Sequence, residues 1–275
     1  MDALELAQKI VRGSYINFSS KEPFIETSSI YRFTNEDITS YFHHFQNKNN
    51  VLSVIGSGNQ ILNTILGGTR TLDCFDISIF PEYYLYLQIA SVVSLSKEDY
   101  INYYLSDDRE ILFSDELYDL ISNNLTGKYK IFWDTLYNFD DGIDIYNSLL
   151  FRQDVYYKKL AIERNTYLQD NNYEKLKNIL KTESIQINPF VTNILNTKLE
   201  KEYDLINLSN ILAYYFNKKE YIEYLKNNFS LTESGEIINY FYDMNDENKK
   251  EFNNLLKQNG YIEEIGNSKL LVYKK

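Results

Sequence analysis

The chain has 275 residues, enough for one large domain or for one domain with a sizeable insertion. Hydrophobic residues make up 44% and aromatic residues 16% of the chain, which excludes an intrinsically disordered protein. The net charge of -11 opposes general binding to phosphate backbones, although it leaves room for a local basic patch, so no nucleic acid is expected as a partner.

The sequence offers no sign of an oxidising compartment or of a membrane. The single cysteine, Cys74, excludes an internal disulfide framework and makes a reducing cytosol the default. Residues 1–13 lack the basic region and the continuous apolar core of a signal peptide. The uncharged stretch 49–69 is too polar and too rich in glycine for a membrane span. We therefore expect a cytoplasmic protein without a transmembrane segment.

The first predicted elements are an N-terminal helical segment, a strand and a glycine turn. The helical segment covers residues 1–48 and includes a helix over 38–45. An apolar, β-branched strand over 51–55 runs directly into Gly56-Ser57-Gly58, and a helix over 60–66 follows. A second strand over 71–75 ends at Asp76. This order is that of a mononucleotide-binding βαβ unit.

The rest of the chain alternates a long helical region with further strands. Residues 80–180 are mainly helical, and a helical insertion is predicted at about 98–170 because the region is long for one crossover. Later strands are predicted over 184–187, 203–208, 236–242, 261–265 and 270–273, the last two as a hairpin. The sequence thus predicts an α/β fold: a Rossmann-like, doubly wound, mostly parallel sheet with a C-terminal antiparallel hairpin, in a domain over 49–275. This layout fits class I methyltransferases better than dehydrogenases.

The glycine turn and the acid after the second strand form the strongest motif. Glycines let the chain turn tightly and let a ligand approach the backbone, and the free N–H groups at a helix start favour an anion. That anion would be the methionine carboxylate of S-adenosylmethionine (SAM) or the pyrophosphate of a dinucleotide. Asp76 is spaced to accept hydrogen bonds from ribose hydroxyls. The alternative is a purely structural tight turn.

The third glycine of the dinucleotide fingerprint separates the two ligand classes. In G-x-G-x-x-G the last glycine permits close packing of helix and strand. Here that position holds Ile61, which is too large for this packing. The sequence therefore favours SAM over NAD or FAD.

A known family has segments similar to VLSVIGSGNQILNTILGGTRTLDCFDIS, PEYYLYLQIASVVSLSKEDYINYY, IYRFTNEDITSYF and YDLINLSNILAYY. These segments resemble the diacylglycerol aminocarboxypropyltransferase-like family and its bacterial relatives, over about half of the chain and in the right order. The resemblance implies a SAM-binding Rossmann-like fold with a site at Gly56, Ser57, Gly58 and Asp76, and with Asn59 or Gln60 near the amino-acid end of SAM.

The chain departs from that pattern at two positions. Many class I methyltransferases have an acid two residues before the first glycine, where this chain has Val54. The usual glycine at position 60 is Gln60. The contact that such an acid makes to the methionine moiety must come from another residue or be absent.

Five further residues are weaker candidates for the site. Ser209 and Asn210 follow the fourth strand and either orient the acceptor or cap the next helix. Tyr31 and Thr34 either close over the SAM carboxylate or adenine or lie in an ordinary buried face. Ile77 follows Asp76 and is placed to flank the adenine.

The predicted function is a SAM-dependent transferase, first of all a methyltransferase, whose acceptor is an unidentified small molecule or lipid. The alternatives are aminocarboxypropyl transfer from SAM, as the resembling family suggests, and a non-catalytic SAM-binding protein. No catalytic residue is assigned, and the acidic composition weighs against a lipid acceptor. No cluster has metal-ligand spacing, so no metal is expected. The sequence does not determine the oligomeric state.

Overall fold

The computed structural model describes residues 2–13, 27–152, 157–214, 217–241, 246–264 and 270–274. The chain forms two compact units. The helical unit comprises Met1–Ser40, Ile55–Leu66 and Ile77–Ile185. The sheet unit comprises Tyr41–Val54, Gly67–Asp76 and Gln186–Lys275.

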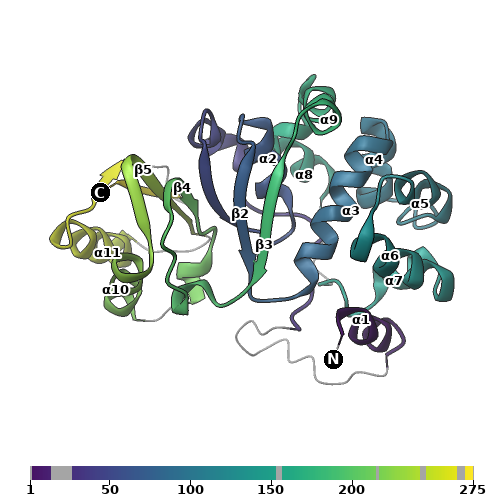
Figure 1. Ribbon diagram of the computed structural model, residues 1–275, viewed down its shortest axis with the longest axis horizontal. Coiled ribbons are helices and arrows are strands. Elements are labelled where there is room, and N and C mark those ends of the chain that lie inside the picture. The colour runs from purple at the N-terminus through teal and green to yellow at the C-terminus, as the bar shows by residue number, and fades with distance from the viewer. Residues whose placement is uncertain are drawn as a thin grey trace. The chain divides into compact units, whose positions relative to one another are not determined.

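A seven-stranded sheet of order β3-β2-β1-β4-β5-β7-β6 forms the centre of the sheet unit (Figure 1). The strands are β1 (Asn50–Val54), β2 (Thr71–Asp76), β3 (Gln186–Val191), β4 (Glu202–Asn207), β5 (Ser230–Tyr240), β6 (Ile262–Glu264) and β7 (Leu270–Lys274). The pairs β3–β2, β2–β1, β1–β4 and β4–β5 are parallel. Strand β7 pairs antiparallel with both β5 and β6. The predicted α/β fold, with a mostly parallel sheet and an antiparallel C-terminal pair, is confirmed. The predicted turn of that hairpin lies outside the described residues.

The strand order reverses at β1. The chain runs outward from β1 to β2 and β3 on one side, and then from β4 to β5 on the other. Val54 at the end of β1 is in register with Phe75 of β2, and Ser53 with Asn207 of β4. The carboxyl ends of these three strands are therefore level, and in open α/β sheets ligands bind beyond such ends at the reversal point.

One face of the sheet carries an apolar core. Leu52 of β1, Ile206 of β4 and Ile237 of β5 belong to it. The helices α10 (Lys218–Asn228) and α11 (Asp246–Gln258) contribute Leu225 and Leu256 among others. Buried apolar surface of this kind holds the helices against the strands.

The helical unit is built around α3 (Phe80–Ser94), which contacts α4, α5, α6 and α9. Most of its residues are buried, and a stripe of Tyr86, Ile89 and Val93 is partly exposed. The other helices are α1 (Ala3–Val11), α2 (Asn59–Leu66), α4 (Lys97–Leu105), α5 (Asp115–Ser122), α6 (Gly127–Phe139), α7 (Gly142–Asn147), α8 (Lys158–Arg164), η2 (Thr166–Leu168) and α9 (Asn172–Thr182). Within the described residues no helix combines the length and the apolarity needed to cross a bilayer.

Two predicted elements differ from the observed ones. The strand predicted over 184–187 is β3, which continues through Pro189 to Val191. Proline lacks an N–H donor, and β3 accepts it because it is an edge strand that pairs only with β2. The helix predicted over 38–45 is the 3₁₀ helix η1 (Ile38–Phe45), which is kinked at Tyr41. The short 3₁₀ helices η3 (Ile194–Asn196) and η4 (Ile211–Tyr214) complete the elements.

Candidate functional site

The glycine loop, residues 55–58, turns the chain from the end of β1 into α2. Gly56 and Gly58 have φ angles of +54° and +82°, which residues with a Cβ rarely adopt. The N–H of Gly58 donates to the carbonyl of Ile55 at 2.7 Å, closing the turn. The predicted tight turn is therefore present, and both glycines are required by its backbone.

The side chain of Asn59 fastens this loop to the rest of the helical unit. Its Oδ1 accepts hydrogen bonds from the backbone N–H of Thr34 at 2.8 Å and from Oγ of Ser57 at 2.6 Å. Its Nδ2 donates to the hydroxyl of Tyr167 at 2.8 Å, and that hydroxyl lies 3.1 Å from the hydroxyl of Tyr100. Asn59 is fully buried, so these bonds act in a medium of low dielectric.

Three of the predicted site residues, Thr34, Ser57 and Asn59, thus lie together. Asn59 meets the side chain of Ser57 and the backbone N–H of Thr34, and Oγ1 of Thr34 accepts from the N–H of Glu36 and from Nε2 of Gln60. Such side chains fix the backbone of the loop. Tyr31, in contrast, is held by Arg152, whose guanidinium carbon lies 4.5 Å from the centre of its ring.

Two glutamine side chains lie against the loop, and the sequence did not single out the second of them. Gln60 and Gln88 are 3% and 0% exposed. Among the described residues, no partner hydrogen-bonds Oε1 of Gln60 or either amide atom of Gln88. A Cβ built on Gly58 would lie 2.9 Å from Oε1 of Gln88, and one on Gly56 would lie 3.9 Å from Oε1 of Gln60. The signal in the sequence was a glutamine inside the mainly apolar, tyrosine-rich stretch 80–94.

The carboxyl edge of the sheet places the other predicted residues. Asp76 ends β2, is half-buried, and its carbonyl accepts from the N–H of Thr192 at 2.8 Å. Ile77 follows it and is also half-buried.

Ser209 follows β4 in a left-handed conformation with a φ of +49°, uncommon for a residue with a Cβ. Its N–H donates to Oδ1 of Asn207 and its carbonyl accepts from the N–H of Tyr240 at 2.6 Å. Its hydroxyl lies 3.5 Å from Oδ1 of Asn210. Strained backbone of this kind persists only where the surrounding structure holds it.

A buried carboxylate, Glu236 of β5, forms the strongest electrostatic cluster of the sheet unit. It is 3% exposed, and Nζ of Lys48 and Nδ1 of His44 lie 2.7 and 3.1 Å from its two oxygens. Burial opposes ionisation of the carboxyl, but the bonds from His44 and Lys48 outweigh it and lower the pKa of Glu236. The cluster joins the segment around η1 to the sheet and is fully compensated.

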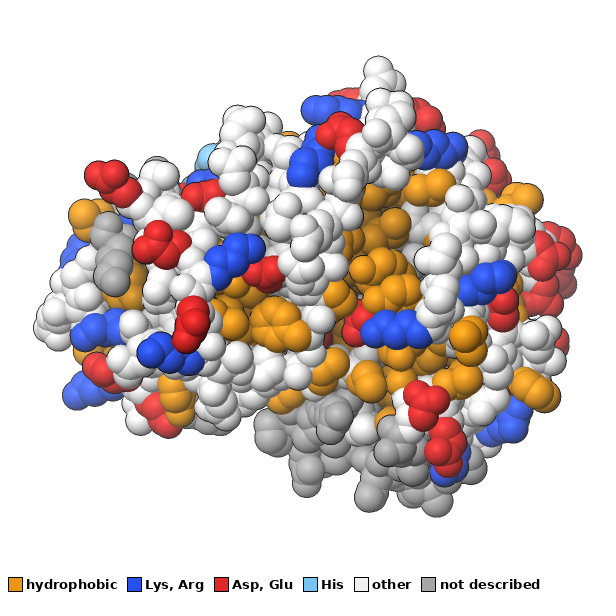
Figure 2. Space-filling view, viewed as in Figure 1, with side chains coloured by type: hydrophobic (Ala, Val, Ile, Leu, Met, Phe, Trp, Pro, Cys, Tyr) orange, Lys and Arg blue, Asp and Glu red, His pale blue; other side chains and the backbone are white. Residues whose placement is uncertain are grey.

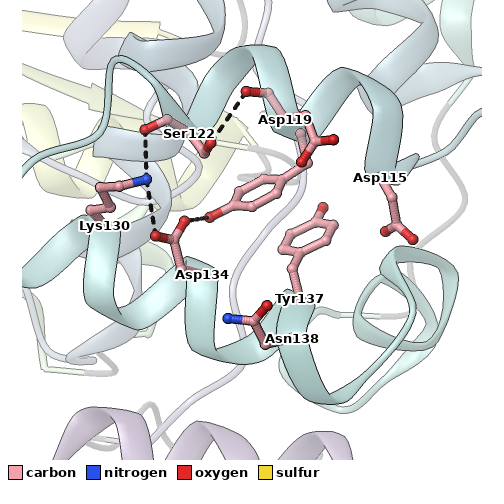
Figure 3. A pocket seen from close by; sticks show the side chains of 8 residues that line it. Asp115, Asp119, Ser122, Lys130, Asp134, Tyr137 and Asn138 are labelled. Carbon is pink, nitrogen blue, oxygen red and sulfur yellow. Dashed lines mark hydrogen bonds and ion pairs between the residues drawn. The ribbon is translucent and has the colours of Figure 1, made fainter.

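A surface pocket of about 340 Å³ lies between α5 and α6 of the helical unit (Figure 3). Tyr118 donates to Asp134 at 2.6 Å, and Lys130 lies 2.9 Å from Asp134. Asp115 and Asp119 of α5 are exposed, and acidic side chains gather over this helix on the surface (Figure 2). The buried polar groups of the pocket are already paired with one another. Its exposed carboxylates are screened by water and salt, so the pocket is not a preorganised binding site.

Within the part of the chain that the structure describes, no three His, Cys, Asp or Glu side chains come together as metal ligands.

Comparison with known protein families gives no match, and no curated protein matches the chain. Similar solved structures include a ribosomal protein L11 methylase from Lactobacillus delbrueckii subsp. bulgaricus, at 12% identity over 82% of this chain and 69% of that one, with a TM-score of 0.34. They also include the rRNA methyltransferase aviRa from Streptomyces viridochromogenes, at 8% identity over 99% of this chain and 84% of that one, with a TM-score of 0.38. Neither likeness assigns the chain to a family, and the resemblance to the aminocarboxypropyltransferase-like family stays a prediction.

These structures contradict one expectation from the sequence. No nucleic acid was expected as a partner, yet one of the two proteins is named an rRNA methyltransferase and the other a methylase of a ribosomal protein. The expectation is therefore wrong as an exclusion. Its physical basis was the net charge, which describes the whole surface and says nothing about one local patch.

Proposed function

We propose that the protein is a SAM-dependent transferase, in the first place a methyltransferase, that binds its cofactor with the glycine loop and with Asp76. The observation that carries the proposal is the sheet. Its order reverses at β1, and β7 lies antiparallel between β5 and β6. The six-stranded dinucleotide-binding order, 3-2-1-4-5-6, has no such inserted strand.

The loop supports binding of an anionic group by its backbone. Gly56 and Gly58 leave their peptide groups uncovered by any Cβ, and α2 begins at Asn59 directly after them. The free N–H groups and the dipole at the start of a helix attract anions. The methionine carboxylate is the group of SAM that meets this requirement.

Unpaired hydrogen-bonding groups beside the loop also support the binding of a ligand. Buried polar atoms in folded proteins are nearly always hydrogen-bonded. Gln60 and Gln88 break this rule beside the loop, among the residues that the structure describes. Asp76, at the carboxyl end of β2, is proposed to accept from the ribose hydroxyls.

SAM, when bound, supplies an electrophilic carbon, and the sulfur keeps the bonding electrons when an acceptor takes that carbon. The task of the chain is then to bind and to orient, which itself lowers the barrier. Thr34, Ser57 and Asn59 hold the loop in a fixed shape for this purpose. Ser209 and Asn210 are proposed to orient the acceptor.

Calorimetric titration of the purified chain with SAM, with NAD as the control ligand, tests the proposal. We expect micromolar binding of SAM and none of NAD. Asp76→Ala should weaken SAM binding about tenfold or more, since bonds to a charged group contribute about 1.5–3 kcal/mol. Asp119→Ala removes a carboxylate from the exposed surface of α5 and serves as the matched control. A well-folded protein that does not bind SAM contradicts the proposal.

The by-product decides the type of transfer. Methyl transfer releases S-adenosylhomocysteine, whereas aminocarboxypropyl transfer releases methylthioadenosine. A protein that binds SAM and releases neither with any acceptor tested would be a binding protein rather than an enzyme.

A further inference from the structure

The amide of Gln88 is the most unusual polar group of the helical unit. It lies in the middle of α3, a largely buried helix, and it is 0% exposed. Both Nε2 and Oε1 are without a hydrogen-bond partner among the described residues.

The amide is aimed at the glycine loop. Oε1 of Gln88 would be only 2.9 Å from a Cβ on Gly58, so a side chain at position 58 cannot coexist with Gln88 in this position. Oε1 of Gln60, 3.9 Å from the position of a Cβ on Gly56, is also buried and has no partner in the described part of the chain. Two buried amide side chains with unsatisfied polar atoms therefore lie beside the glycine loop that leads into α2, where the backbone favours an anion.

Other polar side chains near the loop are not available for a ligand. Both polar atoms of the Asn59 side chain are used, toward Thr34, Ser57 and Tyr167. Val54, two residues before Gly56, has an apolar side chain that offers no acceptor. The glutamine carbonyls beside the loop are acceptors that no described residue uses.

We propose that Gln88, assisted by Gln60, binds the amino-acid end of the ligand held by the glycine loop. The amide carbonyl of Gln88 accepts from the α-ammonium group, and its NH₂ donates to the α-carboxylate that the start of α2 attracts. An amide suits this zwitterionic group because it is both donor and acceptor and carries no charge to repel either half. This inference rests on the proposed function. It makes Gln88 the residue that recognises the amino-acid end of SAM.

The test compares two ligands that differ in that end. S-adenosylhomocysteine carries the amino-acid end of SAM, and methylthioadenosine lacks it. We would titrate both into the wild type and into Gln88→Met, which keeps the shape of the side chain and removes its hydrogen bonds. We expect S-adenosylhomocysteine to bind about tenfold more weakly or worse, and methylthioadenosine to bind within twofold of the wild type.

Ser91→Ala is the matched control, because Ser91 is a fully buried polar residue three positions further along α3 and bonds to Tyr104 instead. It should leave the ratio of the two affinities unchanged.

A thermal melt of the ligand-free proteins gives an independent readout. A buried amide without partners destabilises a fold, so Gln88→Met should melt at the same temperature as the wild type or higher. A purely structural glutamine would give the opposite result.

Each outcome has one meaning. Equal weakening of both ligands, no weakening of either, or a lower melting temperature for Gln88→Met overturns the role of Gln88 while leaving SAM binding intact. A wild-type protein that binds neither ligand overturns the proposed function itself, and this inference with it.

Discussion

Glu236 in the sheet unit and Gln88 in the helical unit are both buried polar residues, and they differ in what surrounds them. The carboxylate of Glu236 has Lys48 and His44 within hydrogen-bond distance. The neutral amide of Gln88 has no partner among the described residues. A charge costs far more to bury than an amide does, and the buried charge is the group that has partners. A buried polar group with complete partners serves the fold, whereas one without partners, beside a glycine loop, points to a ligand.

The largest expected effect comes from breaking the compensated cluster. Glu236→Gln leaves the positive charge of Lys48 without a buried counter-charge, and we expect a loss of about 3 kcal/mol of unfolding free energy. Chemical denaturation at neutral pH measures it. A loss below about 1 kcal/mol would show that the cluster is solvated and that the comparison with Gln88 does not hold.

The same cluster predicts how stability depends on pH. The folded-state pKa of Glu236 lies below its ordinary value of 4.5. Its contribution is therefore fully present above pH 4.5 and is lost as the pH falls through the folded-state pKa. The wild type should lose stability over this acid range more steeply than Glu236→Gln, as measured by melting temperature against pH. Parallel curves for the two proteins would contradict the prediction.

A methyl group on the loop should have the next largest effect. Gly58→Ala places a Cβ on a residue with a φ of +82° and 2.9 Å from Oε1 of Gln88. The left-handed backbone alone costs about 1–2 kcal/mol in a residue with a side chain, and the contact adds to it.

Gly260→Ala is a close control for that substitution, since Gly260 has a φ of +83° and open space around its Cβ position. The difference in unfolding free energy between the two variants measures the contact with Gln88. Gly58→Ala should also weaken SAM binding, whereas Gly260→Ala should not. Equal effects of both variants would show that Gln88 makes no significant contact with position 58.

A smaller effect is expected from the network behind the loop. Tyr167→Phe removes the hydroxyl between Nδ2 of Asn59 and the hydroxyl of Tyr100, at a cost of about 1 kcal/mol. SAM binding should weaken as well, because Asn59 loses the bond that orients it. Tyr173→Phe removes a buried hydroxyl that bonds to the carbonyl of Leu95 instead, so it should change stability alone. Loss of SAM binding in both variants would mean that the network does not act through Asn59.

The smallest effect is expected in the pocket between α5 and α6. Asp119 is exposed, so Asp119→Asn should change the unfolding free energy by no more than about 0.5 kcal/mol. The affinity for SAM should not change. A clear loss of SAM affinity in this variant would indicate that the pocket, and not the glycine loop, is the binding site.

Hydrophobic periodicity and glycine placement predicted much of this fold. The βαβ unit from β1 to β2 was predicted within a few residues because strand, turn and helix signals are all local. The extension of β3 through Pro189 was not, because whether a strand tolerates proline depends on whether it lies at an edge of the sheet.

The candidate site divides in the same way. The sequence alone determined the glycine loop, since positive φ angles at Gly56 and Gly58 follow from the need for a tight turn between a strand and a helix. It also placed Asp76 at the end of β2.

Only the tertiary structure decided what each polar side chain does. The side chains of Asn59 and Ser57, both predicted to bind the cofactor, are bonded to each other. Asn59 is also bonded to residues 25 and 108 positions away. Gln88 gave only a weak signal in the sequence, a glutamine within a mainly apolar helix. It became a candidate because its amide lies against Gly58 without a partner in the described residues. Whether a buried polar group is hydrogen-bonded depends on residues that are distant in the sequence but close in space. Local sequence patterns do not contain that information.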